Sequence, residues 1–86
     1  MVKITTESGF TCEFDNDDWD LLEKLIEADE KPAKIPGVLK YMLGEEKYQD
    51  LRTHCTVEGK VKASLMIKEY YAIVSSEEAK NFTSSQ

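Results

Sequence analysis

Glycine and proline divide this chain into short segments, and these breaks limit the elements that it can form. They stand at Gly9, Pro32, Pro36, Gly44 and Gly59. Proline interrupts a helix because it lacks an amide proton, and glycine is the usual residue just past a helix end. The breaks therefore predict several short helices and one short hairpin.

The segment before the first helix predicts a β-hairpin over about residues 2–14. Apolar or β-branched residues alternate with polar ones on both sides of a short loop. Val2, Ile4 and Thr6 precede the loop Glu7-Ser8-Gly9, and Phe10, Cys12 and Phe14 follow it. The loop glycine suits the left-handed position of a type I turn with a bulge. This pairing places Val2 opposite Phe14 and Ile4 opposite Cys12, on one apolar face that must pack against helices.

Four helices are expected from caps, prolines and apolar spacing. The first runs from a cap at Asp15 or Asn16 to about Glu30, the second from Pro36 to Leu43 with Gly44 as its C-terminal cap, the third from Glu45 to about Cys55, and the fourth from about Val61 to Val74. Lys31–Ile35 is expected to be a linker, and Val57-Glu58-Gly59 a turn.

Helical spacing gives each helix an apolar face. The faces are Trp19, Leu22, Leu25 and Ile26, widened by Leu21 and Ala28; then Val38, Leu39, Met42 and Leu43; then Tyr48, Leu51 and Cys55; and last Ala63, Met66, Ile67, Tyr70, Ile73 and Val74, flanked by Leu65 and Tyr71. The fourth helix is apolar on more than one side, so it is either central or covered by a second copy of the chain.

The last residues differ in composition from the rest. From Ser75 onward the sequence is polar, and Phe82 is its one large apolar residue. We therefore expect residues 77–86 to form a polar, flexible tail. Residues 1–76 are expected to form a single, mainly α-helical domain of four helices with an N-terminal hairpin.

No group of residues in the sequence is arranged for catalysis or metal binding. Cys12 and Cys55 are read as reduced core residues, since nothing at the N-terminus suggests secretion. With His54 they do not supply the four ligands of a zinc site. The adjacent carboxylates Glu45 and Glu46 diverge by about 100° on a helix and cannot share a proton. We expect no enzyme activity, no cofactor and no metal.

Charge is unevenly distributed. The net charge is −6, and nine acids lie between Glu13 and Glu30 with Lys24 as the one base among them. Such a surface opposes binding to a nucleic-acid backbone. No apolar stretch approaches the roughly 20 residues of a membrane span, so we expect no membrane contact. The acidic segment is either a solvated helix face or the surface of a small cytosolic adaptor or nucleic-acid mimic that binds a basic partner.

Aromatic and large apolar residues are the candidates for contact with a protein partner or with a second copy. Tyrosine and tryptophan dominate the energetics of many protein interfaces. The candidate contact residues are Trp19, Leu22, Tyr48, Met66, Tyr70 and Tyr71.

The order of these segments resembles that of the tail assembly chaperones of long-tailed phages of Gram-positive hosts. In that family an apolar helix ending in Leu-Gly is followed by Glu-(Glu/Gln)-x-Tyr-x-x-Leu, which here is Leu43-Gly44-Glu45-Glu46-Lys47-Tyr48-Gln49-Asp50-Leu51. The resemblance covers about residues 14–85. Phe82 departs from it, because a small polar residue is expected after Lys80-Asn81.

The resemblance implies a non-catalytic role in phage or prophage tail morphogenesis. Members of the family are mainly helical, self-associate, and coat the tape measure protein before the tail tube polymerises. It implies the tape measure protein and further copies of the chain as partners, with the tail tube protein as an additional candidate. It also implies a location in the bacterial cytoplasm and absence from the mature virion.

Overall fold

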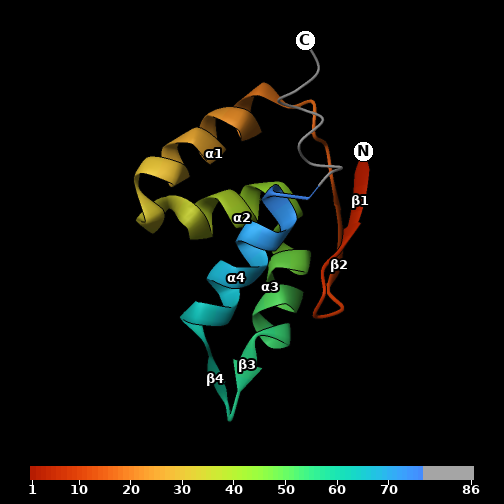
Figure 1. The fold of residues 1–86 in the computed structure, drawn as a ribbon, viewed down its shortest axis with the longest axis vertical. Helices are drawn as coiled ribbons and strands as arrows, with labels where there is room; N and C mark the ends of the chain where they lie inside the picture. The colour runs from red at the N-terminus through yellow and green to blue at the C-terminus, as the bar shows by residue number, and fades with distance from the viewer. Residues whose placement is uncertain (77–86) are drawn as a thin grey trace.

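The computed structural model describes residues 1–76, and the expected tail, with Phe82, lies outside the described residues. The elements in order are β1 (Val2–Thr5), β2 (Thr11–Phe14), α1 (Trp19–Glu30), the 3₁₀ helix η1 (Pro32–Lys34), α2 (Ile35–Leu43), α3 (Glu45–His54), β3 (Thr56–Val57), β4 (Lys60–Val61) and α4 (Ala63–Val74). The prediction of a mainly helical fold with four α-helices and an N-terminal hairpin is confirmed (Figure 1).

The N-terminal hairpin has the predicted register. Val2 pairs with Phe14 and Ile4 with Cys12 in an antiparallel ladder. Gly9 has φ of 96°, the left-handed conformation that the loop requires. One face of the hairpin is buried, and β2 packs against α2. The hairpin runs along one side of the helices (Figure 1).

The start of α1 differs from the prediction. Asp18 is the N-cap, and its Oδ1 accepts the Leu21 amide proton at 3.2 Å. Asp15, one of the two predicted caps, instead accepts the Asp17 amide proton at 2.9 Å in the turn before the helix. The predicted caps at Asp15 or Asn16 are therefore wrong. Residues 15–18, Asp-Asn-Asp-Asp, are all of the types that cap helices, and the turn geometry selects the last one.

The buried face of α1 is also rotated from the predicted one. Leu21 and Ala28 are buried and Leu25 is half-buried, whereas Trp19 is 69% exposed and Ile26 56% exposed. Leu21, Leu25 and Ala28 form their own stripe at spacings of four and three, which α1 packs against α2. Because α1 lies at the edge of the molecule, only one of its two apolar stripes can be covered (Figure 1).

The α2–α3 corner forms as predicted, but the segment before it does not. Gly44 has φ of 85°, and its amide proton is donated to the Lys40 carbonyl at 2.9 Å. The expected linker Lys31–Ile35 instead contains η1, and α2 begins one residue early at Ile35. Pro36 lies in the first turn of α2, where its missing amide proton costs no helical hydrogen bond.

The turn expected at Val57-Glu58-Gly59 is present at Glu58-Gly59, and it joins two short strands into a second hairpin that was not predicted. Thr56 pairs with Val61 and Val57 with Lys60. Glu58 and Gly59 have φ of 53° and 79°, the pattern of a two-residue type I′ turn. Because Val61 belongs to β4, α4 begins at Ala63 and not at Val61.

The core joins the hairpin to all four α-helices. Its members are Ile4, Phe10, Cys12, Phe14, Leu21, Ala28, Ile35, Val38, Leu39, Met42, Tyr48, Leu51, Cys55, Tyr70 and Ile73. Both cysteines are buried and free, which confirms them as reduced core residues. α4 packs on α2, yet Ile67 and Tyr71 stay exposed on its outer side.

Candidate functional site

An apolar groove lies among the helices of the described residues. It has a volume of about 390 Å³ and is formed where η1, α2, α3, β4 and α4 meet. Its lining residues are Pro32, Ala33, Ile35, Pro36, Leu39, Tyr48, Arg52, Val61, Ala63, Met66 and Ile67. Such a volume lies within the range of protein ligand pockets.

The groove has a fixed floor and an exposed rim. Ile35, Leu39 and Tyr48 are buried core residues, so the floor is part of the packed interior. Ile67, 42% exposed, stands at the rim on α4. The groove therefore presents apolar surface to solvent on a scaffold that is already ordered, and binding there would order few additional groups.

The charged residues in and next to the groove-lining segments of the sequence are basic, although the chain is acidic overall. Arg52 is the one charged residue among those that line it. Every charged residue directly before or after a lining residue in the sequence is a lysine: Lys31, Lys34, Lys40, Lys47, Lys60, Lys62 and Lys68. Lys40 Nζ lies 5.5 Å from the centre of the Tyr48 ring. The charge of the lining residues and of their sequence neighbours therefore has the opposite sign to the net charge of −6.

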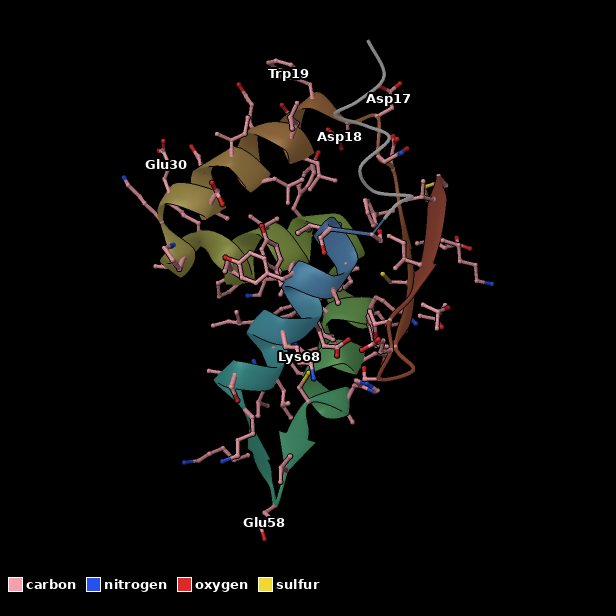
Figure 2. All side chains as sticks on the ribbon, viewed as in Figure 1. Asp17, Asp18, Trp19, Glu30, Glu58 and Lys68 are labelled. Atoms are coloured by element: carbon pink, nitrogen blue, oxygen red, sulfur yellow. The ribbon has the colours of Figure 1, made fainter. Side chains whose placement is uncertain are left out.

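The outward side of α1 is a second apolar surface, of different character. Trp19, Leu22 and Ile26 follow one another at spacings of three and four. The exposed acids Asp20, Glu23, Glu27, Asp29 and Glu30 lie on the same helix. Figure 2 shows Trp19 pointing away from the molecule at the start of α1, near Asp17 and Asp18.

The six predicted contact residues do not form one surface. Tyr48 and Met66 line the groove, Tyr48 buried in its floor and Met66 half-buried. Trp19 and Leu22 lie on the outward side of α1. Tyr70 is 3% exposed and serves the core, while Tyr71, 46% exposed, stands edge-on to it with ring centroids 5.2 Å apart.

A polar network that is buried at Thr6 and Glu69 and exposed at Ser8 and His54 connects the N-terminal loop to α3 and α4, and the sequence interpretation did not include it. Glu69 on α4 is 5% exposed. Its Oε1 accepts the Thr6 hydroxyl proton and its Oε2 the Ser8 hydroxyl proton, each at 2.7 Å. Ser8 Oγ also lies 2.8 Å from His54 Nε2. The network fixes the hairpin loop against the helices.

Serine, histidine and glutamate together are the residue types of a hydrolase triad, but the protons are arranged differently here. Ser8 donates its one hydroxyl proton to the Glu69 carboxylate. His54 Nε2 must then be the donor to Ser8 Oγ, so it does not act as a base toward it. In a triad the carboxylate contacts the histidine and not the serine. In this arrangement Ser8 is not activated for nucleophilic attack.

The position of Glu69 was the available signal for this network. It follows Met66 by three residues and precedes Ile73 by four, on the inward side of α4. A carboxylate on such a side is rarely buried without hydrogen-bond partners. The partners Thr6 and Ser8 are more than 60 residues away in the sequence, and no local pattern connects them to Glu69.

The ionisable groups with shifted pKa values lie outside the groove. Burial raises the pKa of the Cys12 thiol to about 11, although the Lys47 charge opposes the shift. Burial also raises the pKa of the Cys55 thiol. The Tyr41 hydroxyl donates to Asp18 Oδ2 at 2.8 Å and lowers the pKa of that carboxyl. Both thiols are protonated at neutral pH, which makes them poor nucleophiles.

Residues 1–76 contain neither a cluster of metal-ligating side chains nor a membrane-spanning helix. No three histidine, cysteine, aspartate or glutamate side chains in this part of the chain are grouped to hold a metal ion. None of its helices has the length and apolar character needed to cross a bilayer.

Comparison of the chain with protein-family models, with curated proteins and with solved structures finds no match.

Proposed function

We propose that this protein is a non-catalytic chaperone whose groove binds an apolar helical segment of a client protein. From the resemblance around Leu43-Gly44-Glu45-Glu46, we propose the tape measure protein of a phage or prophage as the client and tail assembly as the process. The observation that carries the proposal is the apolar groove with its preformed floor of Ile35, Leu39 and Tyr48.

The shape of this site suits a helix in preference to an extended strand. An amphipathic helix binds a groove through residues at spacings of three and four that enter an apolar floor. A client strand would need an unpaired sheet edge beside the groove, and the strand that lines it, β4, has only two residues, Lys60–Val61, too few to pair along a client strand. A long helical client that exposes apolar stripes before assembly would be kept soluble by such contacts.

Self-association and a location in the host cytoplasm belong to the same proposal. The exposed apolar residues on α1 and α4, led by Trp19, Ile26, Ile67 and Tyr71, give a second copy or the tail tube protein surface to contact. Sedimentation velocity across a wide concentration range tests the self-association. A monomer at every concentration would remove it from the proposal.

The direct test is co-expression with the tape measure protein encoded in the same genome. We expect more soluble client and co-elution of the two proteins on size exclusion. Ile67→Glu places a charge at the groove rim and should abolish co-elution. Ile26→Glu is the matched control, because Ile26 is also an exposed isoleucine on a helix but lies outside the groove.

The outcomes of this test separate clearly. Loss with Ile67→Glu and retention with Ile26→Glu supports the groove as the client site. A wild-type protein that neither solubilises nor binds the client refutes the proposed function. Loss with Ile26→Glu alone would move the contact to α1.

A second candidate function rests on the outward side of α1. Trp19 and Ile26 are exposed there beside five exposed acids, a combination that suits a basic partner. In this case the protein would be a small acidic adaptor or nucleic-acid mimic. Its binding would weaken steeply with added salt, whereas binding dominated by apolar contacts in the groove would change far less.

A further inference from the structure

We propose that the segment bound in the groove is an amphipathic helix with acidic residues beside its apolar stripe. This inference rests on the proposed function and specifies the chemistry of the client. It contradicts the simplest expectation from composition, because a protein with net charge −6 should repel an acidic partner.

The charges around the groove carry the argument. Arg52 lines the groove and is exposed, so its guanidinium is available to a partner carboxylate. Arginine is the side chain best suited to hold a carboxylate, through two parallel hydrogen bonds. None of the residues of the described chain that line the groove is acidic.

The lysines next to the lining residues extend this positive rim on two sides. Lys31 and Lys34 are exposed at the ends of η1, on the side formed by Pro32 and Ala33. Lys60 and Lys62 are exposed on either side of Val61. Lys47 and Lys68 are excluded from the rim, since Lys47 Nζ lies 5.3 Å from the centre of the Phe10 ring and Lys68 lines a different cavity.

The apolar floor and the charged rim together define the pattern of the partner. Apolar residues at i, i+3, i+4 and i+7 would enter the floor between α2 and α4. Acidic residues on the flanks of that stripe would meet Arg52 and the lysines. A helix with basic flanks would bring like charges together at the rim, and this would disfavour the wrong client.

The test uses two synthetic peptides of about 18 residues, long enough for a helix of five turns. Both carry the same leucines at i, i+3, i+4 and i+7, and one has glutamate and the other lysine at the flanking positions. Fluorescence anisotropy gives the Kd of each for the full-length protein. We expect the acidic peptide to bind at least about tenfold tighter at low salt, a difference of about 1.4 kcal/mol.

Charge reversal at the groove identifies the source of this preference. Arg52→Glu should reduce the ratio of the two Kd values at least about threefold, which is within the range of one exposed ion pair. Lys3→Glu is the matched control, because it changes the net charge by the same amount on β1, away from the groove. The control should leave the ratio within about twofold of wild type. Ile67→Glu should weaken both peptides.

Several results would overturn this inference, and the first of them leaves the groove as the client site of the proposed function. Tighter binding of the basic peptide, or equal binding of both, would show that the rim does not select acidic helices. Failure of both peptides, while the intact tape measure protein still co-elutes, would place the client on another surface. If neither peptide binds, and if Arg52→Glu shifts the sedimentation of the protein toward that of a monomer, α1 of a second copy would be the occupant of the groove.

Discussion

The strongest structural prediction concerns the pair of Thr6 and Glu69. The carboxylate is 5% exposed, Thr6 is 7% exposed, and their oxygens lie 2.7 Å apart. Thr6→Val keeps the shape of the side chain and removes the hydroxyl, which leaves one oxygen of a buried carboxylate without its donor. A hydrogen bond to a charged group contributes about 1.5–3 kcal/mol, so we expect a loss of about that size.

Glu69→Gln is the partner substitution, because it removes the charge and keeps an acceptor oxygen. In that background the Thr6 hydroxyl bonds to a neutral group, where a hydrogen bond contributes about 0.5–1.5 kcal/mol. The cost of Thr6→Val should therefore fall. The difference gives a coupling energy of about 1–1.5 kcal/mol between the two residues.

Urea denaturation of the four proteins in the cycle measures this coupling. Circular dichroism is the suitable probe, since Trp19 is 69% exposed and its fluorescence would report unfolding weakly. A loss of 2 kcal/mol should lower the urea midpoint by about 1–2 M. A cost below about 0.5 kcal/mol for Thr6→Val, or a coupling energy near zero, would show that water reaches the carboxylate and would refute the reasoning.

Three further predictions follow from the core and from the shifted pKa values. Leu51→Ala, at a side chain 0% exposed, should destabilise the fold by about 3–5 kcal/mol in thermal melts, and an unchanged melting temperature would contradict the packing. Burial raises the pKa of the Cys12 thiol from 9.0 to about 11, and this difference corresponds to about 2–3 kcal/mol in the free energy of unfolding. The contribution is fully present below pH 9.0 and is lost as the pH rises through 11. Denaturation across that range measures it, and alkaline stability that does not fall would count against the burial of the thiol. The Tyr41 hydrogen bond lowers the pKa of Asp18 in the folded state, so the ionised carboxylate stabilises the fold when the pH is above the pKa of the unfolded chain. This stabilisation is lost as the pH falls through the lower pKa of the folded state. Tyr41→Phe should therefore be less stable than wild type at neutral pH and equal to it in acid, and a deficit that persists in acid would refute the role of the hydroxyl.

Local patterns in the sequence determined much of this fold. The hairpin register, the Gly44 corner, the C-terminal end of α1 and the start of α3 each depend on residues close together in the chain. The β3–β4 hairpin was missed because its strands have two residues each, too few for an alternation to be visible. The one local signal in the sequence was Gly59, a residue that readily adopts the positive φ of the turn.

Features that depend on distant residues could not be read from the sequence. Both stripes of α1 have helical spacing, and only the position of α2 decides that Leu21 is buried and Ile26 exposed. The groove takes residues from five elements, so the predicted contact residues Tyr48 and Met66, which both line it, appeared in the sequence as unconnected aromatic and apolar residues. Their common surface exists only after α4 has packed on α2.

The separation of charge in this molecule also affects how partners approach it. α1, with its five exposed carboxylates, lies toward one end of the long axis, and the β3–β4 hairpin at the other end has Glu58 at its tip but Lys60 in β4 and Lys62 just after it (Figures 1 and 2). The protein is thus an electric dipole, and its field turns a charged helix before the two molecules touch. Ions screen that torque beyond about 8–10 Å in physiological salt. Added salt should therefore slow the association of an acidic helix far more than it speeds its dissociation, which the apolar floor controls.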